Sequence, residues 1–287
     1  MTSGPIVIGA HFSELAAGYD VVLSDVWGVI HNGVDYFPEA CDALMRFRAA
    51  GGCVVLITNS PRPTESVIRQ LGRLKVPGET YDGLISSGEL TRGVIRSRPG
   101  QTIFHMGPER DRSIFTGLKV TFAPLETADY VICSGLFDDE TETPDDYRTR
   151  LEGMFARKQF MVCGNPDVVV ERGDRLLYCA GAIADLYAAM GGEVLYAGKP
   201  YRPIYDAAMT RAKEAGAKDG ARVLAIGDSV RTDLKGAHAF GIDCLFITAG
   251  IHAEELGARG RPDPAALQKI FAAAGEIPKA VMPRLVW

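Results

Sequence analysis

The sequence lacks the signatures of several classes of protein. No apolar run approaches the roughly 20 residues that span a bilayer, and no block of basic residues stands out in a chain whose net charge is −5. The first apolar run is not followed by G-x-G-x-x-G, which argues against dinucleotide binding. The N-terminal segment has no basic stretch before its apolar residues, so we expect no signal peptide. These absences argue against a membrane protein and against nucleic acid as the main partner.

The cysteines give no sign of a metal or disulfide framework. The six cysteines form no C-x-x-C pair, and most of them lie within apolar segments. This pattern is typical of small core residues in a reducing compartment. We therefore expect a cytoplasmic protein with free thiols.

The chain is long enough for two domains. Its 287 residues include 47% hydrophobic and 23% charged residues, an ordinary globular composition. Apolar runs alternate with segments of helical periodicity, which predicts a parallel sheet with right-handed crossovers. Turn residues cluster at Arg98–Gly100 and Gly198–Pro200, so we place an inserted domain at 98–195 between core segments at 1–97 and 196–287. The predicted fold class is α/β, a Rossmann-like parallel-sheet core with an inserted α/β domain.

Local patterns assign most elements of this fold. Inside the insert we expect a helix at Pro108–Phe115, a strand formed by LKVTF at 118–122 and a hairpin formed by VVVERGDRLLYC. A later helix is expected at Thr232–Phe240. The buried strands expected from apolar runs are Val21–Ser24, Cys53–Asn59, Gly83–Ser87 and the runs TIFHMG, DYVICSG, FMVCGNPD, RVLAIGD and IDCLFIT.

Polar residues at the ends of predicted strands form the candidate site. Asp25 ends the first buried strand, Thr58 lies at the end of the second, and Lys199 precedes a proline. Asp228 and Asp233 follow the strand RVLAIGD closely. Open α/β sheets place their ligand crevice at the carboxyl ends of strands. Each residue alone is explained by a turn, a helix cap or a solvated charge, and their common placement favours a functional interpretation.

The motifs resemble those of a known family. Along the chain stand D-x-x-G-V at Asp25, T-N-S at Thr58, then G-K-P, then G-D-S-x-x-T-D ending at Asp233. This series is similar to the haloacid dehalogenase-like hydrolase superfamily. The large insert resembles that of the class IIA members, which carry an α/β cap there and include nitrophenyl, pyridoxal, phosphoglycolate and sugar-phosphate phosphatases. The resemblance implies a Mg²⁺-dependent hydrolase of a small phosphorylated metabolite, with its cap domain at 98–195.

The resemblance also implies a role for each motif. Asp25 would be the nucleophile that forms an aspartyl-phosphate, which splits one difficult hydrolysis into two displacements. Thr58 and the backbone N–H of Asn59 would bind phosphoryl oxygens, and Ser60 in the same loop would also bind the substrate. Lys199 would bridge the nucleophile and the phosphate and offset their repulsion.

A Mg²⁺ site follows from the same resemblance. Asp25, Asp228 and the backbone carbonyl of Trp27 would ligate the ion together with waters, the oxygen set that Mg²⁺ requires. Asp233 would bind the metal site through the coordinating waters, to which it would hydrogen-bond without ligating the ion directly.

One position departs from the family pattern. Family phosphatases carry an aspartate two residues after the nucleophile, and this residue protonates the leaving oxygen and then activates water; here the position is Trp27. Such proton transfer typically contributes about 10²–10⁴-fold, and an indole N–H serves only as a hydrogen-bond donor. His31 is one candidate replacement, although an ordinary loop histidine is the simpler interpretation. An acidic leaving group, as in an acyl or aryl phosphate, would relax the requirement.

Two other interpretations compete with a phosphatase. The first is a metabolite-binding protein that kept the phosphate pocket and lost turnover together with the aspartate. The second is a carbon–halogen or carbon–phosphorus hydrolase of the same superfamily. Dehalogenases need no Mg²⁺ and usually lack the aspartate present at Asp228. The phosphonate branch needs a cap lysine, and Lys119 and Lys158 stand in no supporting motif.

Substrate choice is expected from the cap. The loop Asn165–Ala182 is the best candidate, and Arg62, close behind the Thr58 loop, is placed to meet a second anionic group. The expected partner is a small phosphorylated metabolite, and the resemblance further implies a homodimer through the cap. The candidate contacts in the cap loop are Glu171, Arg172, Arg175 and Tyr178.

Overall fold

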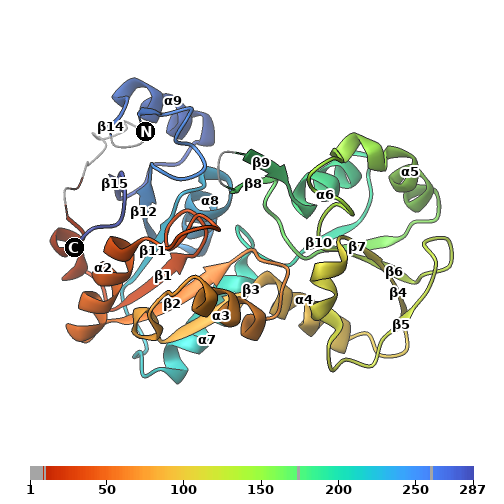
Figure 1. Ribbon diagram of the computed structural model, residues 1–287, viewed down its shortest axis with the longest axis horizontal. Coiled ribbons are helices and arrows are strands. Elements are labelled where there is room, and N and C mark those ends of the chain that lie inside the picture. The colour runs from red at the N-terminus through yellow and green to blue at the C-terminus, as the bar shows by residue number, and fades with distance from the viewer. Residues whose placement is uncertain (1–8, 10, 173–174, 259–260) are drawn as a thin grey trace.

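The structure is a computed structural model that describes residues 9, 11–172, 175–258 and 261–287. Within these residues the strands form one six-stranded sheet, one five-stranded sheet and two short two-stranded sheets. Figure 1 shows the two large sheets beside each other, with the hairpin of β8 (Val169–Arg172) and β9 (Arg175–Tyr178) between them. The predicted α/β fold class is confirmed.

The six-stranded sheet is parallel throughout. In spatial order its strands are β15 (Ala280–Met282), β12 (Asp243–Ile247), β11 (Val223–Gly227), β1 (Val21–Asp25), β2 (Cys53–Thr58) and β3 (Gly83–Ser86). All five residues of β1 are buried, as expected of a central parallel strand. The chain order runs outward from β1 in both directions, so the strand order reverses between β1 and β11. Such a reversal opens a crevice at the carboxyl ends of the two strands.

Helices cover both faces of this sheet because successive strand residues point to opposite sides. Val22, Leu56 and Ile226 belong to one apolar core, and Leu23 and Val55 to another on the opposite face. The first face is covered by α1 (Ser13–Ala16), α2 (Pro38–Ala49) and α3 (Thr64–Arg73), and the second by α7 (Arg202–Glu214), α8 (Lys235–Phe240) and α9 (Pro264–Ala274).

The five-stranded sheet is also parallel. In spatial order its strands are β10 (Val194–Tyr196), β7 (Phe160–Cys163), β6 (Tyr130–Cys133), β4 (Thr102–Met106) and β5 (Thr121–Phe122). One face packs against α5 (Arg148–Ala156) and α6 (Ala180–Ala189), and α4 (Ser87–Arg96) leads from β3 into this second sheet. The short remaining elements are η1 (Gly78–Thr80), η2 (Glu109–Phe115), η3 (Pro144–Tyr147), η4 (Val230–Leu234), β13 (Gly257–Ala258) and β14 (Arg261–Pro262).

Several predicted elements differ in kind or extent. The helix expected at Pro108–Phe115 is a 3₁₀ helix, and only the last two residues of LKVTF form a strand. The helix expected at Thr232–Phe240 starts with a π-helical turn at Val230–Leu234. β10 was not expected, because three residues are too few to establish a period. The strands of the predicted hairpin do pair, but its turn lies outside the described residues.

All six cysteines are free and buried, which confirms them as core residues. No helix in the described ranges combines the length and apolar character that crossing a bilayer requires. The boundaries proposed for the inserted domain stay predictions.

Candidate active site

Asp25 stands at the end of the central strand of the six-stranded sheet. Asp25 pairs with Ile57 on β2, and on the other side of β1 the preceding residue, Ser24, pairs with Ile226 on β11. The side chain is buried, and its Oδ1 accepts a hydrogen bond of 2.7 Å from the backbone N–H of Val26. The chain direction and this hydrogen bond together fix where the carboxylate points.

Lys199 connects Asp25 to the second acidic motif. Its Nζ lies 2.7 Å from Oδ1 of Asp25 and 2.7 Å from Oδ1 of Asp233. Only 3% of the lysine is exposed. The side chain of Asn59 fixes its backbone, since Oδ1 of Asn59 accepts from the N–H of Lys199 at 2.8 Å and Nδ2 donates to its carbonyl at 3.1 Å. These two hydrogen bonds place Lys199, which is 140 residues from Asn59 in sequence, at the carboxyl end of β2.

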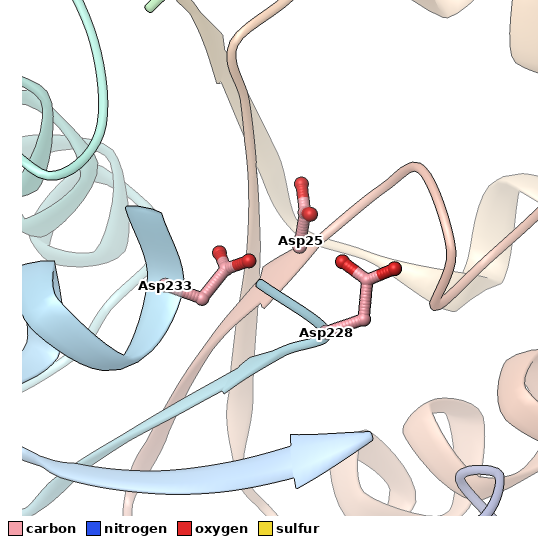
Figure 2. Close-up of side chains that lie close together, drawn as sticks. All are labelled: Asp25, Asp228 and Asp233. Atoms are coloured by element: carbon pink, nitrogen blue, oxygen red, sulfur yellow. The ribbon is translucent and has the colours of Figure 1, made fainter. Parts of the chain in front are cut away.

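Three carboxylates meet in front of the sheet, as Figure 2 shows. Asp25, Asp228 and Asp233 offer oxygens that lie within 4.8 Å of one another, and all three residues are buried. Asp228 directly follows β11, and its Oδ2 accepts from the backbone N–H of Ile251 at 2.8 Å. Asp233 accepts from the backbone N–H of Ser229 as well as from Lys199. The structure therefore brings the predicted acidic residues together.

Burial and repulsion shape the charges of this cluster. Burial raises the pKa of Asp228 to about 7, and the charge of Asp233 adds to this effect. Burial and Asp233 also raise the pKa of Asp25, against the opposing charge of Lys199. Burial by itself lowers the pKa of Lys199, but the charges of Asp233 and Asp25 outweigh it and hold the pKa well above its usual value. Three ionised carboxylates would thus outnumber the ammonium beside them.

The donor set fits a divalent metal ion. Carboxylate and carbonyl oxygens are the ligands that Mg²⁺ and Ca²⁺ prefer, and a cation would relieve the repulsion within the cluster. Two glycines make room for Asp228: a Cβ on Gly28 would lie 2.0 Å from its Oδ2, and one on Gly250 would lie 1.9 Å away. The residues predicted as ligands thus fit the group that the family resemblance implies. The assignment of the individual ligands, including the carbonyl of Trp27, stays a prediction.

The loop after β2 presents polar groups on the other side of Asp25. Thr58 is buried, and its hydroxyl accepts a hydrogen bond of 3.1 Å from the N–H of Ser60. The hydroxyl proton remains available for another acceptor. The side chain of Asn59 has a second role that the sequence did not reveal: besides fixing Lys199, it accepts from the hydroxyl of Ser87 and donates to Oδ1 of Asp167.

Trp27 joins the site to the β8–β9 hairpin. Its indole N–H donates to the carbonyl of Glu171 at 2.6 Å, across 144 residues of sequence. The ring stands edge-on to His31 with centroids 5.0 Å apart. A Cβ on Gly33 would lie 2.5 Å from the indole, so this glycine leaves the space that the ring fills. At the position where the resemblance implies an acid–base group, Trp27 packs against His31 and Gly33 and donates a hydrogen bond to the hairpin.

His31 is poorly suited to donate the proton. It is buried, and its Nδ1 accepts from the N–H of Gly33 at 2.9 Å. Burial lowers the pKa of His31 to about 4, so the ring is neutral at pH 7. The structure favours the simpler interpretation, a structural loop histidine.

Two adjoining cavities surround these residues. The smaller, here called the nucleophile cavity, has a volume of about 80 Å³ and is lined by residues that include Asp25 and Asp228. The larger, here called the cap cavity, has a volume of about 220 Å³ and is lined by residues that include Thr58 and Arg62. The residues that line both cavities are Trp27, Asp167 and Val170.

The predicted cap contacts divide between these cavities. Arg172 and Tyr178 line the cap cavity, and Glu171 lines the nucleophile cavity. Arg175 instead approaches Glu140 on the cap surface. Asp167, which no motif marked individually, lies within the loop Asn165–Ala182 that we expect to select the substrate.

The fold and the site define an α/β enzyme-like protein with an aspartate–lysine centre at a strand-order reversal and an inserted sheet beside it. Residues 22–121 match the family described as haloacid dehalogenase-like hydrolase, and residues 196–273 match the HAD-hydrolase-like family. The chain is similar to a haloacid dehalogenase-like hydrolase from Brucella suis 1330, with 43% identity, 97% of this chain and 100% of that chain covered, and a TM-score of 0.85. The chain belongs to the haloacid dehalogenase-like hydrolase family.

Two more distant proteins are also similar to this chain. The 5'-nucleotidase YutF of Bacillus subtilis (strain 168) is 23% identical over 239 residues, which cover 83% of this chain and 90% of that protein. A possible sugar phosphatase of the HAD superfamily from Cytophaga hutchinsonii ATCC 33406 is 18% identical, with 99% of each chain covered and a TM-score of 0.77. The latter likeness shows a shared fold. The predicted family membership is confirmed.

Proposed function

We propose that this chain hydrolyses a small phosphorylated metabolite through an aspartyl-phosphate at Asp25, with Mg²⁺ as cofactor. The observation that carries the proposal is the position of Nζ of Lys199, 2.7 Å from Oδ1 of Asp25 at the carboxyl end of the central strand. A buried ammonium beside the nucleophile offsets the repulsion between a carboxylate and a phosphate dianion. Phosphoryl transfer depends mainly on such positioning and charge neutralisation.

Each residue of the site has a part in this reaction. The carboxylate of Asp25 attacks phosphorus, and the hydroxyl proton of Thr58 and the backbone N–H of Asn59 bind phosphoryl oxygens. Asp233 holds Lys199 in place at 2.7 Å. Asp25, Asp228 and the carbonyl of Trp27 would hold Mg²⁺, which when bound supplies positive charge to the phosphoryl oxygens.

The proposed substrates are small phosphate monoesters. The names of the two distant relatives, a 5'-nucleotidase and a possible sugar phosphatase, support this class. The cap cavity, at about 220 Å³, gives the leaving group a place beside the phosphate site. We also propose that residues 1–97 and 196–287 form the core and that 98–195 form a cap, whose β8–β9 hairpin closes over Asp25.

A metabolite-binding protein is the second candidate function. The observation that favours it is the indole of Trp27 in the position where family phosphatases carry their acid–base aspartate. Such a protein would bind phosphate esters without hydrolysing them.

A panel of phosphate monoesters assayed with Mg²⁺ tests the proposal. Wild type should release phosphate, and Asp25→Asn should release none. Asp20→Asn is the matched control, because Asp20 stands just before the same strand, is half-exposed and pairs with Arg222. Tight ester binding by the wild type without phosphate release would favour the binding protein instead.

A further inference from the structure

We propose that Asp167 is the residue that transfers the proton in this reaction, in place of the aspartate that Trp27 has displaced. The inference rests on the proposed phosphatase function and extends it to a residue of the cap. It assigns the leaving-group proton to a carboxyl group on the segment between β7 and β8, far in sequence from the nucleophile.

The two cavities define where the phosphoryl group must lie. Asp25 lines the nucleophile cavity, and Thr58 lines the cap cavity. A phosphoryl group that is attacked by Asp25 and held by Thr58 therefore lies at the junction of the two cavities. Asp167 is the carboxyl-bearing residue among those that line both cavities. It is half-buried, so the cavities can reach its side chain.

Asp167 is held in place by hydrogen bonds. Nδ2 of Asn59 donates to its Oδ1 at 2.9 Å, and Asn59 is itself fixed to the backbone of Lys199. The backbone N–H of Asp167 donates to Oδ1 of Asn165 at 3.1 Å, and its carbonyl accepts from the N–H of Gly181 at 3.0 Å. Oδ1 is thus positioned by the loop that binds phosphate, and Oδ2 is left to meet the substrate.

Two other acids line the cap cavity, Asp111 and Asp139. Asp111 forms an ion pair with Arg62 at 3.5 Å, and Asp139 forms ion pairs with Arg110 and, at 3.5 Å, with Arg172. These two carboxylates line the cap cavity and not the junction. Burial raises the pKa of Asp111 although the charge of Arg62 opposes the effect, so the position of these residues, away from the junction, sets them apart from Asp167.

Besides Asp228, which is a predicted metal ligand, two further acids lie near the nucleophile. Both oxygens of Asp233 accept hydrogen bonds, from Lys199 and from the N–H of Ser229. Glu171 lines the nucleophile cavity, on the hairpin strand β8, and is the acid that the experiment must separate from Asp167.

The charge state of Asp167 supports the assignment. Burial raises the pKa of this carboxyl above its usual value, although the charge of Lys199 and the hydrogen bond from Asn59 oppose the effect. A raised pKa favours the protonated form that a general acid needs before the first step.

The proposed reaction has two displacements at phosphorus. In the first, a carboxylate oxygen of Asp25 forms a bond to phosphorus while the bond from phosphorus to the leaving oxygen breaks. The leaving oxygen keeps the electron pair and takes the proton of Asp167, so an alcohol departs. In the second, the carboxylate of Asp167 takes a proton from a water whose oxygen forms a bond to phosphorus while the bond from phosphorus to the Asp25 oxygen breaks. The electron pair of that bond stays on the Asp25 carboxylate, inorganic phosphate leaves, and Asp167 is again protonated.

The test compares Asp167→Asn with wild type on phosphate esters of graded leaving-group pKa. The substituted amide keeps an oxygen that can accept from Asn59, so the contact between cap and core survives. We expect hydrolysis of alkyl phosphates to fall by about 10²–10⁴-fold. With 4-nitrophenyl phosphate, whose leaving group needs no proton, we expect a rapid burst of one equivalent of nitrophenol followed by slow turnover. The burst arises because the first step survives and the second lacks its base.

Control variants make the result specific. Asp185→Asn removes another contact between cap and core, the ion pair with Arg231, and should show neither the burst nor the leaving-group dependence. Asp167→Glu should restore part of the alkyl phosphate activity. Thermal melting of each variant verifies that it is folded.

The outcomes separate the inference from the function on which it rests. The inference would be overturned if Asp167→Asn lowered the rate of hydrolysis by the same factor for all esters and showed no burst. It would also be overturned if Glu171→Gln showed the burst and Asp167→Asn did not. In either case wild-type turnover that is lost in Asp25→Asn would leave the proposed function standing. A wild type that hydrolyses no ester in the series would overturn both.

Discussion

Lys199 shows how a single residue sets the chemistry of this site at the expense of stability. The ammonium is buried between Asp25 and Asp233, with both N–O distances at 2.7 Å. Such buried ionic groups add little net stability, because removing each charge from water costs several kcal/mol. Once they are buried, however, the loss of one partner leaves the others uncompensated. The arrangement is understandable as a means to hold a positive charge where a phosphate dianion must bind.

Lys199→Met should therefore reduce both activity and stability. We expect phosphate release to fall by about 10²–10³-fold, as when a positioned charge or donor is removed from a transition state, and the free energy of unfolding to drop by about 3–5 kcal/mol. Urea denaturation and a phosphate assay measure the two effects. Lys213→Met is the control: this lysine pairs with Asp219 on the surface, so its loss should cost at most about 1 kcal/mol. Equal effects of the two substitutions would contradict the assignment.

Gly250 offers a second test at the scale of one residue. An added Cβ would lie 1.9 Å from Oδ2 of Asp228, so Gly250→Ala must displace that carboxylate. We expect the variant to need a higher Mg²⁺ concentration for half-maximal activity and to gain less thermal stability from Mg²⁺ than wild type. Gly72→Ala on α3 is the control, since a Cβ there meets nothing within 4 Å. A Mg²⁺ requirement that Gly250→Ala leaves unchanged would count against Asp228 as a ligand.

At the scale of elements, Trp27 connects the loop after β1 with the β8–β9 hairpin. The indole of Trp27 donates to the carbonyl of Glu171 at 2.6 Å, and both residues line the nucleophile cavity. The side chain of Trp27 therefore attaches the hairpin to the loop after β1. The family resemblance implies an acid–base aspartate at this position, and here the position carries a hydrogen-bond donor to the hairpin instead.

Trp27→Phe should loosen the hairpin while keeping most of the ring volume. The lost hydrogen bond is worth about 1 kcal/mol, which corresponds to about a 5-fold change in the population of the closed hairpin. Faster hydrogen exchange in β8 and β9 and a higher KM would reveal the change. Phe104→Leu, in the cap sheet, is the control and should leave exchange in the hairpin unaltered. Unchanged exchange in Trp27→Phe would show that the hairpin is held by other contacts.

The elements themselves were largely predictable, and their side-chain contacts were not. Buried runs such as Val21–Asp25 carry a local signal, and the residues at their ends follow from chain direction alone. The contacts of Trp27 with Glu171 and of Asn59 with Asp167 join residues 144 and 108 positions apart, and no periodicity encodes them. β10 escaped prediction because it has three residues and gains its stability from pairing with β7.

At the scale of the whole molecule, the strand-order reversal decides where function can lie. The carboxyl ends of β1, β2 and β11 meet there, and the return of the chain from the inserted sheet brings Lys199 to the same point. The sequence could predict this convergence because each motif lies either at the end of a strand or where the chain returns from the inserted domain. It could not predict which cap residue faces the nucleophile, since that depends on how the two sheets pack.

The proposed Mg²⁺ site would couple metal binding to protonation and folding, and this coupling gives a prediction with two opposite slopes. The folded-state pKa of Asp228 is about 7, above its ordinary value of 3.8. Between these values the metal-free folded protein binds more protons than the unfolded chain, so its free energy of unfolding should fall as pH rises, by at most about 1.4 kcal/mol per pH unit for one such group. Mg²⁺ binds the ionised carboxylate, so the stabilisation by Mg²⁺ should instead grow with pH over the same window and level off above about pH 7.

Urea denaturation between about pH 5 and pH 8 measures both slopes, with a chelator in one series and excess Mg²⁺ in the other. Asp228→Asn isolates the contribution of one carboxyl, because other groups titrate equally in both proteins. The difference in free energy of unfolding between metal-free wild type and Asp228→Asn should decrease with rising pH, while the gain from Mg²⁺ should increase in wild type only. A Mg²⁺ gain that is constant across this range, or that Asp228→Asn retains in full, would mean that the ion binds elsewhere in the molecule.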